Sequence, residues 1–138
     1  MTCLKYKGRR YEWVYIPYTF NNEIISHHLA GKPGDTKPYF QCLDDLKQKI
    51  GEQTPVILHT DHGSVYSSRA FAKVHGIYTI LHSMSRVATP TDNPIIESIN
   101  SWIKQEMYLD FKIHQCDNLH ASLDDFTTTT TSLDLPLL

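Results

Sequence analysis

The sequence has few cysteines, no long apolar run and no excess of positive charge. Its three cysteines, Cys3, Cys42 and Cys116, lie far apart and lack the spacing of metal ligands, so free thiols in a reducing compartment are expected. No apolar segment approaches the roughly 20 residues that a membrane helix needs. The first residues also lack the basic and then apolar pattern of a signal peptide. These absences argue against a membrane-spanning domain and against a small disulfide-stabilised one.

The acidic charge is weak and is concentrated at one end of the chain. The 138 residues include 13 Lys and Arg and 15 Asp and Glu, for a formal net charge of −2. Taken alone, this balance argues against a nucleic-acid partner. However, residues 1–10 carry four basic and no acidic residues, while residues 117–138 carry four acidic and no basic residues. Residues 1–116 are therefore net positive, and the overall charge does not exclude DNA.

Apolar periodicity and turn residues predict an α/β chain. Hydrophobic residues make up 41% of the sequence, which is enough for one domain with a core. The continuous apolar run 55–59 is typical of a central strand buried on both faces. The predicted elements are two strands within 4–18 around a turn at 7–9, a strand at 23–25, an amphipathic helix after 33–34 with Tyr39, Leu43, Leu46 and Ile50 on one face, a strand at 55–59, a short helix through Ala72 that ends at Gly76, a strand at 77–82 and a long helix from Pro94.

This order of elements predicts a mixed central sheet flanked by helices. The long helix from Pro94 should present a single apolar stripe to the core. Trp13 and Trp102 are expected in the core rather than on a base-stacking surface. The pair His27-His28 is expected on a strand, with one ring inside and one outside.

Two carboxylates, Asp61 and Glu97, lie at positions where catalytic or metal-binding side chains are often found. Asp61 follows the predicted buried strand and precedes Gly63, at the edge where open α/β sheets collect ligands. Glu97 lies in the first turn of the long helix, with Asn100 and Lys104 further along the same face. Phosphoryl transfer between nucleic-acid strands needs carboxylates that converge on divalent cations, and a nearby cation that holds the phosphate backbone. These residues therefore indicate a candidate site for metal-dependent chemistry on nucleic acid.

At this point the chain resembles a known family. It is similar to the catalytic core shared by retroviral integrases and bacterial insertion-sequence transposases in two stretches, His59-Thr-Asp61-His-Gly63-Ser-Val-Tyr66-Ser-Ser68 and Thr91-Asp-Asn93-Pro-Ile-Ile-Glu97-Ser98-Ile-Asn100. The resemblance is closest to insertion-sequence transposases with an integrase-like core, and it extends over roughly residues 2–116.

The resemblance implies a ribonuclease-H-like fold with a site of two aspartates and one glutamate, which binds two Mg²⁺ or Mn²⁺ ions. The implied activity is cleavage at 3′ ends followed by strand transfer into target DNA. By position, Asp61 matches the second aspartate and Glu97 the glutamate, so both are candidate catalytic residues and metal ligands. Lys104 matches the basic residue that follows the glutamate by seven positions. Lys104, Asn100 and Arg86 are the candidate DNA-binding residues, and the loop 85–93 that holds Arg86 corresponds to one that closes on DNA in the family.

The first aspartate of the family has no counterpart in the sequence. In the family it stands two residues before a threonine, and Thr2 holds the place of that threonine here. Glu12 and Glu23 on neighbouring strands are candidate substitutes, although neither is expected to converge on the site. A two-metal site that lacks one ligand should bind its ions poorly. We therefore interpret residues 1–116 as an integrase catalytic core without the start of its first strand, truncated and inactive.

Residues 117–138 depart from the family in another way. Leu119 to Phe126 resembles the start of the last core helix, but five threonines, Thr127 to Thr131, replace its continuation. A frameshift near Thr127 accounts for this run, because codons for Tyr-Tyr-Asn-Asn read one base out of register encode threonines. An aberrant tail, loss of the last helix and a poorly stable domain are expected.

Each candidate also has an ordinary structural interpretation. Asp61 alone suits a turn before glycine, Glu97 alone suits the first turn of a helix, and Lys104 suits a solvated helix face. His59, Asp61 and His62 are candidate zinc ligands, but two such residues at a strand end point to opposite faces. The basic stretch 5–10 is either a solvated hairpin or one that faces DNA.

Two classes of function follow from these observations. The first is a metal-dependent DNA strand-transferase core, now incomplete. The second is a non-catalytic remnant that binds DNA or pairs with a full-length transposase subunit. A ribonuclease-H-type nuclease that acts alone is a weaker third candidate. For the first two, the expected partner is double-stranded DNA in the cytoplasm of a prokaryote, with no membrane involved.

Overall fold

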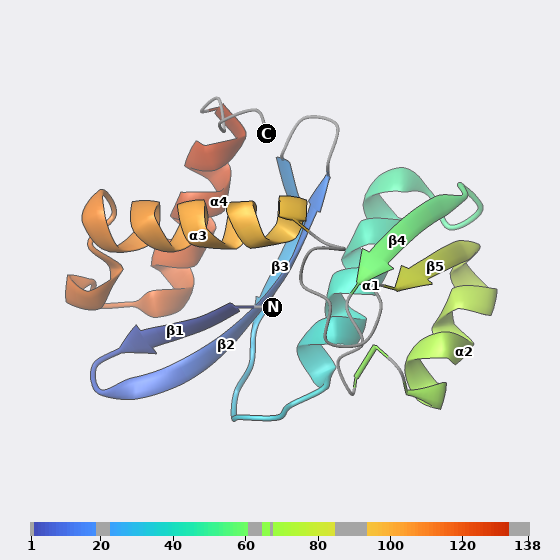
Figure 1. Cartoon of the computed structure of the whole chain (residues 1–138), viewed down its shortest axis with the longest axis horizontal. Helices are drawn as coiled ribbons and strands as arrows, with labels where there is room; N and C mark the ends of the chain where they lie inside the picture. The colour runs from blue at the N-terminus through green and yellow to red at the C-terminus, as the bar shows by residue number, and fades with distance from the viewer. Residues whose placement is uncertain (1, 19–22, 61–64, 67, 85–93, 133–138) are drawn as a thin grey trace.

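A computed structural model of the chain describes residues 2–18, 23–60, 65–66, 68–84 and 94–132. No helix within these ranges is long and apolar enough to cross a membrane. In chain order the elements are β1 (Thr2–Tyr6), β2 (Arg9–Tyr18), β3 (Glu23–Leu29), α1 (Lys37–Ile50), β4 (Val56–Thr60), α2 (Arg69–Tyr78), β5 (Ile80–Met84), α3 (Pro94–Leu109), the 3-10 turn η2 (Ile113–Gln115) and α4 (Leu119–Ser132) (Figure 1).

The described strands pair in two groups. The first three form an antiparallel sheet in the order β1-β2-β3, while β4 and β5 form a parallel pair. Lys7 and Gly8 join β1 to β2 with φ angles of 47° and 76°, the left-handed conformation that a tight hairpin turn requires. Antiparallel and parallel pairing are thus both present, as predicted for a mixed sheet. The hydrogen bonds between the described strands nevertheless form two sheets rather than one central sheet.

Helices α3 and α4 cover one face of the antiparallel sheet (Figure 1). Trp13 of β2 and Ile103 of α3 are fully buried between the sheet and these helices, and the half-buried Trp102 packs against the edge of the same cluster of apolar residues. The predicted core position is therefore confirmed for Trp13, whereas Trp102 is only half-buried at the edge of the core. We call this group the sheet core; its buried residues are Leu4, Tyr6, Trp13, Tyr15, Ile24, Ile99, Ile103, Met107, Ile113, Leu119, Leu123 and Phe126.

Helix α1 packs on the opposite face of β2 and β3. Its Tyr39 and Leu43 are buried against Val14 of β2, and this second cluster continues to Phe71 of α2 and Ile80 of β5. The predicted apolar face of the helix is confirmed at its buried positions. This cluster, to which β2, α1, α2 and β5 all contribute, therefore connects the two sheets within the described residues.

The prediction that β4 is buried on both faces is wrong. Ile57 is 75% exposed, and Leu81, its register partner in β5, is 66% exposed. The neighbouring positions Val56 and Leu58 are half-buried and pack toward the second cluster. The apolar run 55–59 therefore belongs to a strand with one covered face, and its length alone did not reveal which face that is.

The predicted end of the short helix at Gly76 is also wrong. Helix α2 runs through Gly76 to Tyr78, and β5 begins at Ile80 rather than at residue 77. Ser68 caps the helix start, since its Oγ accepts a hydrogen bond from the Phe71 backbone N at 3.1 Å. An interior glycine costs a helix only about 1 kcal/mol, which packing at Phe71 readily offsets.

The last helix of the chain is present, contrary to expectation. Helix α4 runs through the threonines 127–131 to Ser132. Leu119, Leu123 and Phe126 are buried in the sheet core, because their spacing of three and four residues places them on one face of the helix. The expected loss of this helix is therefore wrong for residues 119–132. The proposed frameshift, which concerns the origin of the threonine run, remains a prediction.

Candidate functional site

Glu97 is exposed at a defined helix end. It lies in the first turn of α3, which begins at Pro94, a residue whose fixed φ suits the first helical position. A carboxylate there is stabilised by the positive end of the helix dipole. Glu97 is thus held by the helix and is open to solvent.

Asn100 lies one turn beyond Glu97 and is held against the antiparallel sheet. It is half-buried, and its Oδ1 accepts a hydrogen bond from the hydroxyl of Tyr15 in β2. Burial raises the pKa of Tyr15, so this hydroxyl stays protonated and remains a donor. The bond fixes the first turns of α3 on β2 and so fixes the position of Glu97 relative to the sheet.

Lys104 follows on the same stripe of α3 and is exposed. Within the described part of the chain it has no ion-pair partner. One turn later, the Tyr108 hydroxyl accepts a hydrogen bond from the backbone N of Lys5 in β1 at 2.8 Å. The stripe therefore carries a carboxylate at its start and an unpaired cation in its middle.

Asp61 and Arg86, the other two predicted site residues, lie outside the described residues. Thr60, which precedes Asp61, is the last residue of β4 and is buried. Its Oγ1 lies 2.7 Å from Nε2 of His82 in β5, so the two strands are tied together at the point where β4 ends.

The described residues do not by themselves form a metal site. They contain no group of three or more His, Cys, Asp or Glu side chains placed to hold an ion. For the alternative zinc site, His62 lies outside the described residues, as Asp61 does, and Nδ1 of His59 lies 3.0 Å from Oγ of Ser83. Of the two carboxylates predicted to bind the catalytic ions, Glu97 is the one whose position is described.

Glu12 is directed away from Glu97. Its carboxylate oxygens each accept a hydrogen bond from the Gly34 backbone N at 3.3 Å, in the segment between β3 and α1. Alternate residues of β2 face opposite sides, and Tyr15, which binds Asn100, faces α3. Glu12 therefore lies on the other face of the sheet and does not replace the missing aspartate.

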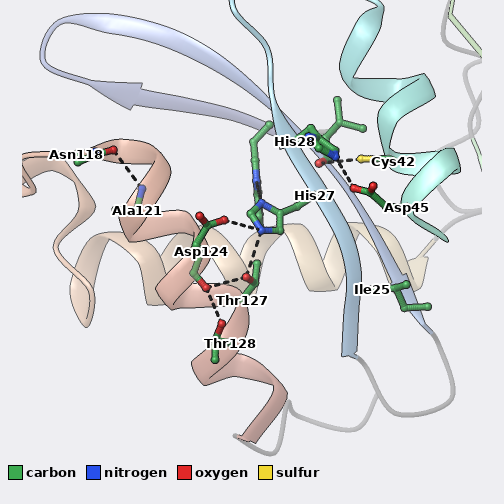
Figure 2. A network of polar contacts seen from close by, with 12 residues as sticks. Ile25, His27, His28, Cys42, Asp45, Asn118, Ala121, Asp124, Thr127 and Thr128 are labelled. Atoms are coloured by element: carbon green, nitrogen blue, oxygen red, sulfur yellow. Dashed lines mark hydrogen bonds and ion pairs between the residues drawn. The ribbon is translucent and has the colours of Figure 1, made fainter. Parts of the chain in front are cut away.

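A polar network on β3 joins the strand to the helices on both of its faces (Figure 2). Nε2 of His27 lies 3.2 Å from Oδ1 of Asp124 in α4 and 3.3 Å from Oγ1 of Thr127, while Nε2 of His28 lies 2.5 Å from Oδ2 of Asp45 in α1. The prediction of one ring inside and one outside is wrong, because both rings lie under helices. The adjacent histidines were visible in the sequence, but their partners are distant along the chain.

Trp13 determines the tautomer of His27. The Trp13 Nε1, which can only donate, lies 3.2 Å from Nδ1 of His27, so Nδ1 accepts and carries no proton. The proton of the neutral ring is then on Nε2, toward Asp124. Burial lowers the pKa of His27, and the nearby Asp124 carboxylate opposes this effect. The His27 side chain on β3 therefore connects its strand to β2, through Trp13, and to α4, through Asp124.

Comparison with known proteins places these residues in context. The family model described as the integrase core domain matches residues 1–90. A curated relative from Escherichia coli strain K12, the "Putative transposase InsK for insertion sequence element IS150", is 33% identical over 92 residues, which are 66% of this chain and 32% of that protein. The chain thus spans less than half the length of this relative.

Solved structures match the fold over nearly the whole chain. A chain of the simian T-cell lymphotropic virus intasome, determined in complex with PP2A regulatory subunit B56 gamma, matches with a TM-score of 0.83 at 21% identity, over 98% of this chain and 47% of that one. The HTLV-2 integrase catalytic core domain in complex with magnesium matches with a TM-score of 0.67 at 21% identity, over 93% and 79% of the two chains. The predicted mixed α/β, ribonuclease-H-like fold of integrase cores is confirmed.

Proposed function

This chain belongs to the integrase core domain family, and on that premise we propose that it is the catalytic core of an insertion-sequence transposase that acts on double-stranded DNA. The observation that carries the proposal is the exposed carboxylate of Glu97 at the start of α3, followed on the same stripe by the unpaired cation of Lys104. The family implies DNA transposition, and because curated relatives are bacterial transposases, the proposed location is the cytoplasm of a prokaryote.

Asp61 and Glu97 are the proposed catalytic residues and metal ligands. Asp61 directly follows β4 in the sequence, and Glu97 lies in the first turn of α3. Bound Mg²⁺ or Mn²⁺ would supply the positive charge that stabilises the oxygens at the reacting phosphate. The HTLV-2 core in complex with magnesium supports this choice of ion. The two carboxylates hold the ions, while Lys104, Asn100 and Arg86 bind and orient the DNA.

A polypeptide of these 138 residues contains two of the three carboxylates that the family site uses. Thr2 holds the place that follows the first aspartate, and Glu12 is directed to the opposite face of the sheet. Two ligands leave the ions weakly held. Such a polypeptide is therefore expected to bind DNA without transferring strands, and an aspartate placed before Met1 is expected to restore metal-dependent cleavage.

Nicking of a supercoiled plasmid in the presence of Mn²⁺ tests this proposal. The 138-residue chain should leave the plasmid intact, and a chain extended by a short strand that ends in Asp before Met1 should nick it. In the extended chain, Asp61→Asn and Glu97→Gln should each abolish nicking. Glu52→Gln, which changes an exposed carboxylate after α1, is the matched control and should retain it. Nicking that survives the changes at Asp61 and Glu97 would contradict the assignment of both residues.

A second candidate is a non-catalytic remnant that binds DNA or pairs with a full-length transposase subunit. The observation that favours it is the exposure of Ile57 and Leu81 side by side on the β4–β5 pair, apolar surface of the kind that protein partners cover. Mixing the chain with a full-length transposase of the same element separates the two candidates. Co-elution of the two proteins, with inhibition of transposition, would favour the remnant.

A further inference from the structure

The β1–β2 hairpin presents four exposed cations around its tip. Lys5 and Lys7 come before the turn, Arg9 and Arg10 come after it, and all four side chains are exposed. Residues 1–11 contain no acidic residue. Within the described part of the chain, none of the four cations has an ion-pair partner. The hairpin tip is therefore a compact group of positive charges that the described residues do not neutralise.

The register of the hairpin places like charges together at a cost to stability. Lys5 lies directly opposite Arg10, and like charges at opposed positions destabilise a pair of strands. The turn also holds Lys7 at a φ of 47°, a conformation that lysine adopts less readily than asparagine or glycine. A polyanion bound at the tip would relieve the repulsion. The opposed charges of Lys5 and Arg10 and the unfavourable φ of Lys7 both cost stability, so neither is expected of a hairpin with a purely structural role. Binding of a polyanion gives a reason for both.

The hairpin is attached to the end of α3 that lies far from Glu97. The Tyr108 hydroxyl accepts a hydrogen bond from the Lys5 backbone N at 2.8 Å, so β1 and the last turn of α3 lie side by side (Figure 1). At a rise of 1.5 Å per residue, Glu97 and Tyr108 are about 16 Å apart along the helix axis. Lys104 lies between them. The helix carries no further base between Lys104 and its end, where Glu106 and Asp110 hydrogen-bond each other, so Lys104 and the hairpin form two separate groups of positive charge.

We propose that the β1–β2 hairpin binds the phosphate backbone of the DNA on which Glu97 acts, beyond the contact made by Lys104. The proposal rests on the proposed function, because Glu97 marks the reacting phosphate. Successive phosphates of one strand are spaced about 3.4 Å along the duplex axis, so a duplex that runs parallel to α3 would meet the hairpin about five nucleotides from that phosphate. Duplex DNA is favoured over an anionic membrane because the hairpin is attached to α3, the helix that carries the proposed metal ligand Glu97 and the exposed cation Lys104.

Equilibrium binding to a duplex at several salt concentrations tests the proposal. The hairpin variant changes Lys5, Lys7, Arg9 and Arg10 to glutamine. A matched control removes the same charge at other exposed positions, with Lys32, Lys37, Arg69 and Lys73 changed to glutamine. The probe is a fluorescent 30-base-pair duplex of arbitrary sequence, followed by anisotropy, and circular dichroism checks that both variants are folded.

The hairpin variant should bind the duplex at least tenfold more weakly than the unchanged chain at moderate salt. Every phosphate that the variant no longer neutralises lowers the slope of log K against log salt by about 0.9, so the slope should fall by about 2–4. The control should bind within about threefold of the unchanged chain, because unspecific removal of charge acts weakly at a distance across a salt-screened surface.

The failure of this proposal can be told apart from the failure of the proposed function. If the unchanged chain binds the duplex and the hairpin variant matches the control, the hairpin proposal is overturned while the proposed function stands. If the unchanged chain does not bind the duplex even at low salt, the proposed function fails first. Binding to phosphatidylserine vesicles that the hairpin variant loses, with duplex binding intact, would assign the hairpin to a membrane instead.

Discussion

The two sheets of the molecule differ in how completely they are covered. The antiparallel sheet has α3 and α4 on one face and α1 on the other, and Trp13 at its centre is 0% exposed. In the β4–β5 pair, Ile57 is 75% exposed and Leu81 66% exposed. Because buried apolar area is the main source of stability, the antiparallel sheet with its helices holds most of it. The parallel pair, whose first strand leads in sequence to Asp61, is held mainly through α1 and α2.

The largest expected effect lies in the sheet core. Phe126→Ala removes a side chain that is 1% exposed and lies against Phe111, with ring centroids 5.1 Å apart. A loss of about 3–5 kcal/mol in the free energy of unfolding is expected, measured by urea denaturation. A loss below about 1 kcal/mol would mean that α4 is not part of the cooperative fold, and would favour the aberrant-tail interpretation of residues 117–138.

A smaller effect is expected at the network that joins α4 to β3. His27→Leu leaves the buried Nε1 of Trp13 without its acceptor, which costs about 1–3 kcal/mol near neutral pH. His27→Asn keeps an oxygen within reach of Trp13 and should cost less. Urea denaturation of the two variants in parallel measures the difference, and equal losses would contradict the role assigned to the Trp13 bond.

The same network predicts a dependence on acid. Burial lowers the pKa of His27 from its ordinary 6.5, so the unfolded chain binds the proton more readily than the folded one. The contribution of His27 is therefore fully present above pH 6.5 and is lost as the pH falls through the lower value of the folded state. Asp124 opposes this shift, while His28 and Lys49 reinforce it. Denaturation between pH 7 and pH 5 should show a smaller loss for His27→Leu than for the unchanged chain.

In the parallel pair, loss of a polar contact should lower the free energy of unfolding by less than the loss of Phe126 from the sheet core does. Thr60→Val removes the hydroxyl that lies 2.7 Å from Nε2 of His82, at an expected cost of about 1 kcal/mol. Amide exchange should quicken in β4 and β5 while β2 and β3 remain protected. A loss as large as that of Phe126→Ala would show that the two sheets unfold as one unit and would remove the contrast between them.

The smallest effect is expected on the exposed face of the pair. Ile57→Thr replaces a largely exposed apolar side chain with one that keeps the β-branched shape, so the free energy of unfolding should change by less than about 0.5 kcal/mol. Denaturation of the chain by itself measures this. A loss of more than about 2 kcal/mol would mean that Ile57 is covered in solution, by another copy or by a segment of the chain.

Local patterns in the sequence predicted the elements whose partners are near in the chain. The β1–β2 hairpin follows from the turn around Gly8, the apolar face of α1 follows from its helical spacing, and Glu97 follows from its place after Pro94. The position of Glu97 at an exposed helix end could be predicted because one helix determines it. Whether it meets Asp61 depends on how β4 and α3 approach, which no local pattern specifies.

The family and the order of the elements could be predicted from the sequence alone, because motifs and periodicity involve residues that are close together in the chain. Which apolar residues are covered could be learned only from the folded arrangement of helices and strands. Ile57 is exposed while Phe126, beside the threonine run, is buried, because burial depends on which helix packs on which face. The same holds for His27 of β3, whose polar partners lie on the neighbouring strand β2 and on α4, which is about 100 residues away in the chain.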